Sequence, residues 1–224
     1  PKIILLSGAK GNGKATLVSH LLHYYFDKKN YIENKKYFNT SSSFHIQFLN
    51  NLFPNIFYFD DSNDQGFKID DVRTLKYNLT KTSFINDKRF VILDDVETFN
   101  HNSLNALLKI IEEPGINTHF ILINNKSMEL LDTIKSRTIE FKIFLSEKKR
   151  HQIISSLLNI FNQKISLDKD LVEISPGQYL RYNYFFQENE IDINEDFSEN
   201  FRKILNSNQK GKNILIKNLL LFFI

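Results

Sequence analysis

A glycine-rich segment at residues 8–14 constrains the fold of this chain more than any other stretch of its sequence. It has the pattern G-x-x-x-x-G-K, it follows the apolar run Ile3–Leu6, and an amphipathic segment starts at Thr16. A strand, a glycine-rich turn and a helix in this order are typical of a phosphate-binding loop, in which backbone N–H groups and the helix dipole hold the phosphate. The alternative is a chance match in an ordinary strand–turn–helix, and the flanking segments favour the phosphate loop.

The composition excludes several classes of protein. The 224 residues include no cysteine, so disulfides and thiolate metal sites are excluded. A formal net charge of +3 is too small to predict a nucleic-acid partner by itself. No apolar run approaches the roughly 20 residues of a membrane span, and no signal peptide is visible. We therefore expect a cytoplasmic protein with no membrane partner.

Strands and helices are expected to alternate up to about residue 145. Apolar runs predict five buried strands, at residues 2–7, 56–59, 90–93, 120–123 and 139–144. Apolar residues at helical spacing predict helices at 14–27, 69–81 and 100–113, with shorter ones near 44–52 and 127–136. In the first helix, the residues expected to face the core are Leu17, Val18, Leu21, Leu22 and Tyr25. The predicted fold class is α/β, with a parallel five-stranded sheet between helices.

From Ser146 onward the pattern is helical. Further helices are expected after Ser146 and at residues 168–174, 177–188 and 197–207. We expect a core domain at 1–145, a small helical domain at 146–208 and the start of a third domain at 209–224. The chain begins at Pro1 on a predicted strand and ends at Ile224 in an apolar run, so we interpret it as a fragment of a longer protein.

Two aspartates, Asp94 and Asp95, follow the predicted third strand. An acidic residue there, downstream of a phosphate loop, is where a carboxylate organises Mg²⁺, and in many ATPases the next carboxylate activates water. Aspartate is one methylene shorter than the usual glutamate, so Asp95 would hold a water less well. Solvated or helix-capping aspartates are the alternative interpretation.

Ala15 occupies the position where a Ser or Thr hydroxyl normally binds Mg²⁺. Thr16 does not substitute for it, because the next residue is turned about 100° around a helix. Mg²⁺ would then bind more weakly, through phosphate oxygens and water. The sequence therefore argues against efficient hydrolysis and leaves a role for Mg²⁺ open.

Other polar residues carry weaker signals. Asn125 ends the fourth strand and would lie beside the end of the third if the two are neighbours; an amide that senses a γ-phosphate and an ordinary loop asparagine are equal alternatives. Arg137, taken alone, is better interpreted as a surface cation. His20 and His23 are close on one helix, but no carboxylate or thiolate accompanies them, so no metal site is predicted.

Several stretches together resemble the delta-prime subunits of the bacterial DNA polymerase III clamp loader, which are AAA+ proteins. They are G-K-A-T-L at 13–17, F-P-N-I at 53–56, I-D-D-V-R-T-L at 69–75, V-I-L-D-D-V-E at 91–97, N-A-L-L-K-I-I-E-E-P at 105–114, I-K-S-R-T at 134–138 and S-P-G at 175–177. The motif at 105–114 is highly specific for clamp loader subunits. The resemblance extends from Ile3 to about Leu205.

The resemblance implies a P-loop AAA+ core, a helical lid and a collar domain. It implies nucleotide contacts from Gly8, Gly11, Asn12, Gly13, Lys14, Ala15 and Thr16. It makes Asp94 and Asp95 Walker B-like and Asn125 sensor-like, and it gives Arg137 a role in trans, at the ATP of a neighbouring subunit. The implied partners are gamma/tau and delta subunits in a ring, the sliding clamp and primed DNA, at the replisome.

The departures from the family pattern, taken together, suggest an incomplete hydrolytic site. Besides Ala15 and Asp95, Thr138 replaces a cysteine, and Gly177 stands near the place of an arginine that touches the γ-phosphate in other subunits. Many relatives carry a four-cysteine zinc module after the first helix, and a chain without cysteine has no such module and no zinc. The resemblance thus implies a component of the DNA polymerase III holoenzyme that could bind ATP or ADP, with weak or no ATPase activity of its own.

Three alternatives remain open. The first is an active gamma/tau-type ATPase subunit, against which Ala15, Asp95 and Gly177 argue. The second is a nucleotide-binding enzyme of another class, such as a small-molecule kinase, for which the motif at 105–114 gives no support. The third is a DNA-binding protein that uses no nucleotide.

Overall fold

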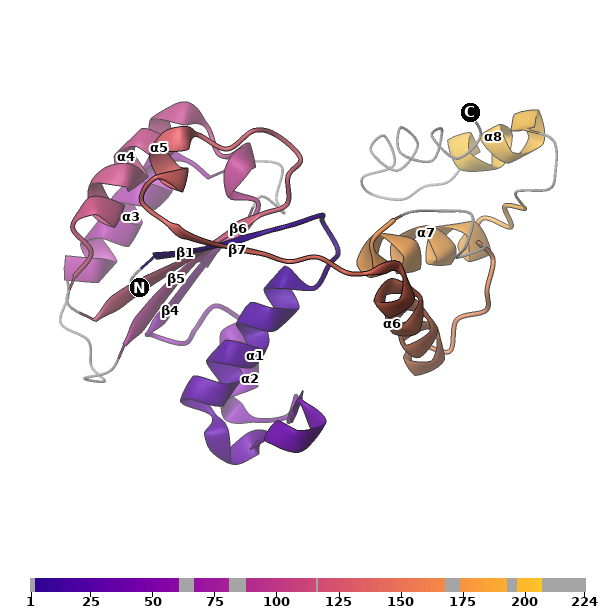
Figure 1. Cartoon of the computed structure of the whole chain (residues 1–224), viewed down its shortest axis with the longest axis horizontal. Helices are drawn as coiled ribbons and strands as arrows, with labels where there is room; N and C mark the ends of the chain where they lie inside the picture. The colour runs from indigo at the N-terminus through magenta and orange to yellow at the C-terminus, as the bar shows by residue number, and fades with distance from the viewer. Residues whose placement is uncertain are drawn as a thin grey trace. The chain divides into compact units, whose positions relative to one another are not determined.

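The computed structural model describes residues 3–60, 67–80, 88–115, 117–167, 174–192 and 197–206 (Figure 1). The chain forms two compact units, one of residues 1–9 and 13–143, the other of residues 10–12 and 144–224. The collar expected at 209–224 and most of the helix expected at 168–174 lie outside the described residues. None of the described helices is both long and apolar enough to cross a membrane.

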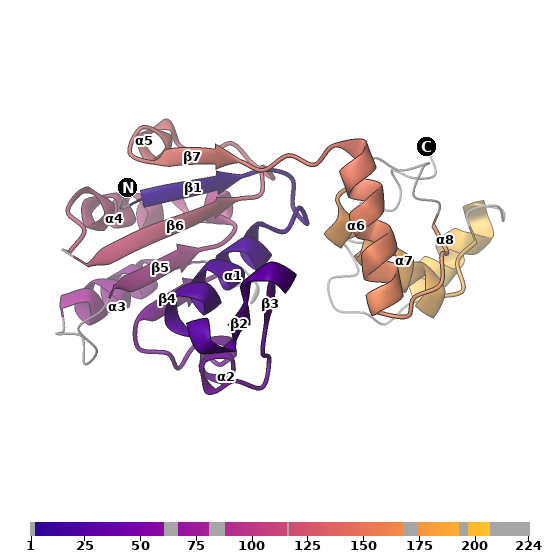
Figure 2. The ribbon, with the colours of Figure 1, turned by 60° about the horizontal axis from the view of Figure 1, so that its bottom comes forward.

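The first unit is built on a sheet of five parallel strands in the order β4–β5–β6–β1–β7, which confirms the predicted fold class (Figure 2). The strands are β1 (Ile3–Ser7), β4 (Ile56–Phe59), β5 (Arg89–Leu93), β6 (Thr118–Asn124) and β7 (Ile139–Lys142). All five predicted strands are present, and the last is shorter than expected. Because the strands are parallel, their carboxyl ends share one edge of the sheet.

Alternate residues of the central strands enter two different cores. In β5, Val91 and Leu93 pack in the core of α3 (Ile69–Thr80) and α4 (His101–Glu112), whereas Phe90 and Ile92 pack in the core of α1 (Lys14–Phe26) and α2 (Ser43–Leu49). Figure 1 shows these two pairs of helices on opposite faces of the sheet. A strand covered on both faces must be apolar throughout, and for this reason the apolar runs in the sequence predicted the strands correctly.

The core-facing stripe predicted for α1 is only partly correct. Val18 and Leu22 are buried, but Leu17, Leu21 and Tyr25 are 48%, 42% and 38% exposed. The two rows are about 100° apart around the helix, and only the row of Val18 and Leu22 packs in the core of the sheet. Sequence periodicity alone did not show how wide the covered face is.

The helix predicted at 127–136 is also shorter, because α5 spans only Asp132–Lys135. The chain leaves β6 as a loop in which Lys126 has a positive φ of 57° and Ser127 hydrogen-bonds to Glu97. These hydrogen bonds hold Ser127 in the loop, and α5 begins only at Asp132, after its N-cap Leu131.

A histidine–aromatic cluster organises the segment between α1 and β4. This segment contains the short 3₁₀ helices η1 (Lys28–Asn30) and η2 (Glu33–Lys35), the hairpin of β2 (Tyr31–Ile32) and β3 (Tyr37–Phe38), and α2. The fully buried His23 stacks on Phe38 at 3.8 Å, and its Nδ1 donates to the Ser19 carbonyl oxygen at 2.7 Å. Its Nε2 must therefore accept, at 2.9 Å, from Nδ1 of His45. Ring stacking and these hydrogen bonds join α1, the hairpin and α2. Within the described ranges no group of three or more His, Cys, Asp or Glu residues could hold a metal ion.

Stability should depend on pH through His23. Burial lowers the pKa of His23, and its hydrogen bond to Ser19 opposes the shift only in part. The folded chain then binds fewer protons than the unfolded chain. The neutral His23 ring therefore stabilises the fold above the ordinary pKa of histidine, and this stabilisation is lost as the pH falls through the lowered pKa of the folded state. We predict that wild type loses stability relative to His23→Phe in urea unfolding as the pH falls below about 6.5, the ordinary pKa of histidine. A stability difference that does not change with pH would contradict this role.

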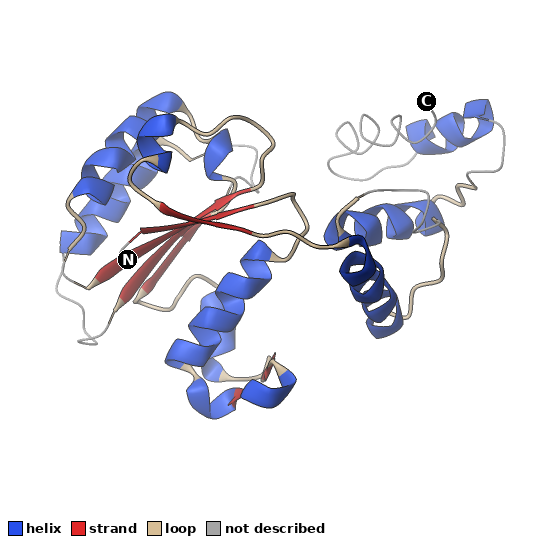
Figure 3. Ribbon diagram, in the orientation of Figure 1, coloured by secondary structure: helices blue, strands red, loops and turns tan. Residues whose placement is uncertain are grey.

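The described part of the second unit consists of helices and loops (Figure 3). Its helices are α6 (Glu147–Ile160), α7 (Pro176–Glu188) and α8 (Phe197–Asn206). Ser146 and Ser175 cap α6 and α7, because their side chains accept hydrogen bonds from backbone N–H groups three residues on. Their shared core contains Ile154, Leu158, Leu167, Tyr179, Tyr182, Phe185 and Phe186. The fully buried Asn183 accepts from the N–H groups of Ser166 and Leu167 and donates to the Lys164 carbonyl oxygen, which fixes the loop after α6.

Candidate functional site

The phosphate loop has the backbone geometry that its glycines permit. Gly11 and Gly13 have φ angles of 89° and 84°, in the left-handed region that favours glycine, and Gly13 is the N-cap of α1. A Cβ on the buried Gly8 would lie 2.5 Å from the carbonyl oxygen of Ile143, so a side chain there would displace the backbone. The three glycines of the predicted loop therefore each meet a backbone requirement.

Lys14 lies inside this loop. Its side chain is buried, and Nζ donates to the carbonyl oxygens of Gly8 at 2.7 Å and Ala9 at 2.8 Å. The first turn of α1 carries no acidic residue, so nothing within that turn neutralises the positive end of the helix dipole. Ala15 and Thr16 are exposed on the same turn. A cationic side chain beside a helix N-terminus and glycine N–H groups fits an anionic phosphate.

The end of β6 joins the loop to the two aspartates. The Gly8 N–H donates to the carbonyl oxygen of Asn124 at 3.2 Å, and Ser7 pairs with Asn124 in the sheet. On its other side β6 pairs with β5, the strand that ends just before Asp94. The prediction that Asn125 lies beside the end of the third strand is therefore confirmed.

Donors from the protein occupy both oxygens of Asp94. Its Oδ1 accepts from the Asp95 N–H at 2.9 Å and from Nδ2 of Asn125 at 3.3 Å, while its Oδ2 accepts from the Tyr58 hydroxyl at 2.7 Å. The Asn125 amide also donates to Asp95. Burial, followed by the charge of Asp94, raises the pKa of Tyr58, so its hydroxyl remains a donor. Tyr58 was missed by sequence reasoning; the only signal was a hydroxyl in an otherwise apolar strand.

These residues fit a phosphate better than they fit Mg²⁺. Ala15 offers no hydroxyl ligand, and the acceptor oxygens of Asp94 already bind protein donors. A metal held in the usual way would need both groups. The glycine loop and Lys14 could hold a phosphate, whereas Ala15 and Asp94, as bonded here, do not offer Mg²⁺ its usual ligands.

Arg137 contacts neither the phosphate loop nor the aspartates in the hydrogen bonds and ion pair described here; its partners include Glu112 and Thr133. It follows α5 in a turn, and its Nη2 lies 2.7 Å and its Nε 3.0 Å from Oε1 of Glu112. Its Nη1 donates to the Thr133 carbonyl oxygen at 2.9 Å. The side chain of Arg137 is 38% exposed, so the guanidinium is held in place and remains accessible. Glu112, at the end of α4, was not singled out from sequence, although it belongs to the motif at 105–114.

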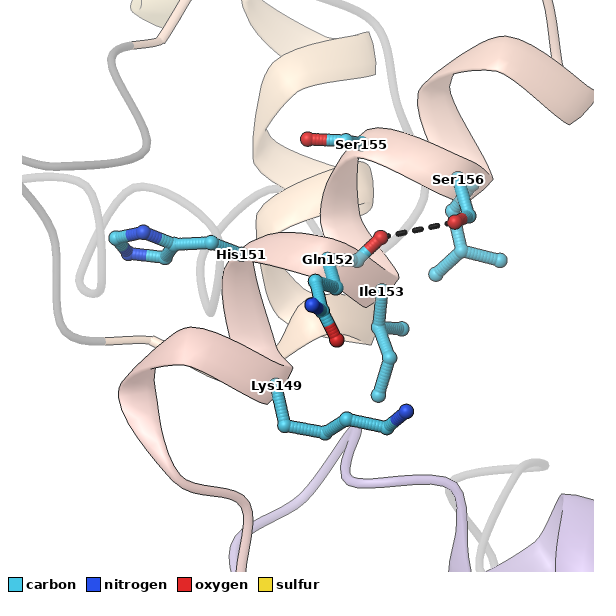
Figure 4. A pocket seen from close by; sticks show the side chains of 7 residues that line it. Lys149, His151, Gln152, Ile153, Ser155 and Ser156 are labelled. Atoms are coloured by element: carbon cyan, nitrogen blue, oxygen red, sulfur yellow. Dashed lines mark hydrogen bonds between the residues drawn. The ribbon is translucent and has the colours of Figure 1, made fainter.

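Two surface depressions lie elsewhere. One runs along α6, where Figure 4 shows Lys149, Gln152 and Ile153, with the Ser156 hydroxyl donating to the Gln152 carbonyl oxygen at 2.9 Å. All its lining residues belong to that one helix. The other lies between α3 and α4, and its lining combines apolar residues with the charged Arg73, Lys76, Lys109 and Glu113. Neither of these two depressions is lined by the phosphate loop or the aspartates.

A family model described as DNA polymerase III, delta subunit, matches residues 1–146. The chain belongs to this family. It is a clamp loader protein of the delta-prime type with an AAA+ fold, as its sequence motifs and sheet order indicated.

Individual relatives agree with this assignment. The chain is 36% identical to the DNA polymerase III subunit delta' of Pseudomonas aeruginosa over 77 residues, which are 34% of this chain and 24% of the relative. It is 29% identical to the subunit delta' of Buchnera aphidicola over 100 residues, 45% of this chain and 31% of the relative. The crystal structure of a DNA polymerase III gamma subunit-related protein from Thermotoga maritima matches with a TM-score of 0.52 and 19% identity, over 96% of this chain and 65% of that one. The matched regions are thus less than two thirds of each relative.

Removing the Tyr58 hydroxyl should destabilise the first unit. A hydrogen bond to a charged group is worth about 1.5–3 kcal/mol when buried, and Tyr58 is half-buried, so Tyr58→Phe should lose about 1–2 kcal/mol in urea unfolding. Tyr24→Phe is the matched control, because Tyr24 is 43% exposed and Phe keeps its ring. Equal losses in the two variants would show that the hydroxyl of Tyr58 does not stabilise Asp94.

Proposed function

We propose that this chain is part of a delta-prime subunit of the DNA polymerase III clamp loader. It would work with gamma/tau and delta subunits in a ring that loads the sliding clamp onto primed DNA, at the replisome in the bacterial cytoplasm. Family membership and the specific motif at 105–114 support this proposal. Contact with DNA would be made through backbone phosphates and shape, in keeping with the small net charge.

The observation that carries the proposal is the way in which the Arg137 side chain is oriented and exposed. Its guanidinium is oriented by two different acceptors, Glu112 and the Thr133 carbonyl, and it remains partly exposed. An arginine of this kind stabilises the charge that develops on a transferred phosphoryl group when it reaches into a neighbouring site. The chain's part in ATP hydrolysis would then be to supply Arg137 in trans.

Its own site would bind ATP or ADP and hydrolyse ATP weakly or not at all. The glycine loop and Lys14 provide the phosphate contacts, while Ala15 and the engaged Asp94 leave Mg²⁺ poorly held. An oriented water would also be less well placed by Asp95 than by a glutamate.

The alternative is an active gamma/tau-type ATPase subunit. The complete phosphate loop with its buried lysine is the feature that favours it. Turnover of ATP by the purified chain in the presence of Mg²⁺ separates the two proposals, because sustained multiple turnovers would reject the proposal that its own ATPase activity is weak or absent.

Replacing Arg137 should impair hydrolysis by the neighbouring subunit. In a loader reconstituted with gamma and delta subunits, Arg137→Ala should lower the ATPase rate while gel filtration shows an intact complex, because an arginine finger acts on the transition state. The matched control is Arg73→Ala, which removes another exposed arginine with an ion pair of 2.8 Å, to Asp70. An unchanged rate in Arg137→Ala would reject the role in trans.

Nucleotide binding should depend on Lys14 and little on Mg²⁺. Lys14→Ala should weaken binding of labelled ATP about tenfold or more, because charge-assisted hydrogen bonds to phosphate are lost. Adding Mg²⁺ should change the wild-type affinity little, whereas Ala15→Ser should make it Mg²⁺-dependent by restoring the hydroxyl. Lys28→Ala, just beyond the other end of α1, is the control. Strong Mg²⁺ dependence in wild type would show that the metal is held by other groups.

A further inference from the structure

Glu97 is a buried carboxylate that none of the roles above uses. It lies in η3 (Val96–Thr98), directly after the aspartate pair, and is only 5% exposed. Asp95, the N-cap of η3, has a left-handed φ of 55°, which is uncommon for a residue other than glycine. Burying a charged carboxyl group is costly unless donors satisfy it.

The donors come from the loop after β6. One oxygen of Glu97, Oε1, accepts from the Asn125 N–H at 2.9 Å, the Ser127 N–H at 3.2 Å and the Ser127 hydroxyl at 2.9 Å. Between these two residues, Lys126 is left-handed with a φ of 57°. N–H groups that converge around a left-handed residue form an anion-binding concavity, a nest. The loop of residues 125–127 is such a nest, and its anion is an internal carboxylate.

The same loop carries the amide that bridges the aspartates. Asn125 binds Glu97 through its backbone and Asp94 and Asp95 through its side chain. The Lys126 N–H donates to the Asn124 side chain at 2.7 Å, which closes the turn. Glu97 thus connects the segment after β5 to the segment after β6 at the edge where the phosphate loop begins.

We infer that Glu97 is a positioning residue, which holds the 125–127 loop so that the Asn125 amide stays on the aspartate pair. Oε2 of Glu97 has no hydrogen-bond partner among the described residues, so the three hydrogen bonds from the loop all go to Oε1. Glutamine keeps an acceptor oxygen at that place and alanine removes it. A phosphate-sensing role for Asn125 rests on the proposed function. The role of Glu97 in holding the 125–127 loop is independent of it.

Amide hydrogen exchange on the whole chain tests the inference directly. In Glu97→Ala, the amides of Asn125 and Ser127 should exchange about tenfold faster than in wild type, since each loses a hydrogen bond to a charged acceptor. Amides of β1 and α4 should change much less, and Glu97→Gln should restore most of the protection. Unchanged exchange at Asn125 and Ser127, a uniform rise over the whole first unit, or no rescue by glutamine would each overturn the inference.

A milder variant keeps the test decisive if Glu97→Ala does not fold. Ser127 is exposed, and Ser127→Ala removes its hydroxyl, which is one of the three donors to Oε1 of Glu97. Amide exchange at Asn125 should become faster, by a smaller factor than in Glu97→Ala. Ser156→Ala in α6 is the matched control, because it removes an exposed hydroxyl that bonds only to its own helix. Equal exchange at Asn125 in these two variants would reject the nest.

A second readout links Glu97 to the phosphate site. The ratio of ATP to ADP affinity, measured with labelled nucleotides, should shift in Glu97→Ala in the same direction as in Asn125→Ala, and the double variant should shift no further. An additive double variant would mean that Glu97 does not act through Asn125. If wild type binds neither nucleotide, the nucleotide part of the proposed function fails, and the exchange experiment still decides the role of Glu97.

Discussion

The parallel pairing of β5, β6 and β1 is the constraint on which the rest of the first unit depends. Parallel strands buried on both faces must be apolar along their length, so polar groups collect where the strands end. The carboxyl end of β6 lies between the other two, where the Asn124 carbonyl accepts from Gly8 and the next residues bind the aspartates and Glu97. The phosphate loop and the acidic pair are therefore parts of one connected edge.

At this edge the protein satisfies its own charges. The Lys14 ammonium is held by loop carbonyls, the oxygens of Asp94 accept from Tyr58, Asn125 and a backbone N–H, and Glu97 fills a nest. Each pairing offsets part of the cost of removing a charged group from water. Arg137 belongs to a separate set of contacts, in which an ion pair with Glu112 orients its guanidinium.

Much of this was predictable from sequence because the signals were local. The apolar runs predicted all five strands, and Asn125 was expected beside the end of the third strand if the two strands are neighbours, which the strand order confirms. The exposed row of α1 was predicted wrongly, since periodicity marks apolar residues and does not show which of them a neighbour covers. Tyr58, Glu97 and Glu112 were missed because each finds its partner at least 25 positions away in the sequence.

By itself, the sequence determined the elements, the family motifs and the absence of a hydroxyl at Ala15 and of any cysteine. These are properties of single residues or of short, contiguous segments. Only the tertiary structure decided that Tyr58 engages Asp94, that Glu97 holds the Asn125 loop and that Glu112 orients Arg137. The physical reason is that a buried polar group takes whichever donor or acceptor the fold brings within hydrogen-bond distance, and strand order and loop conformation set that distance.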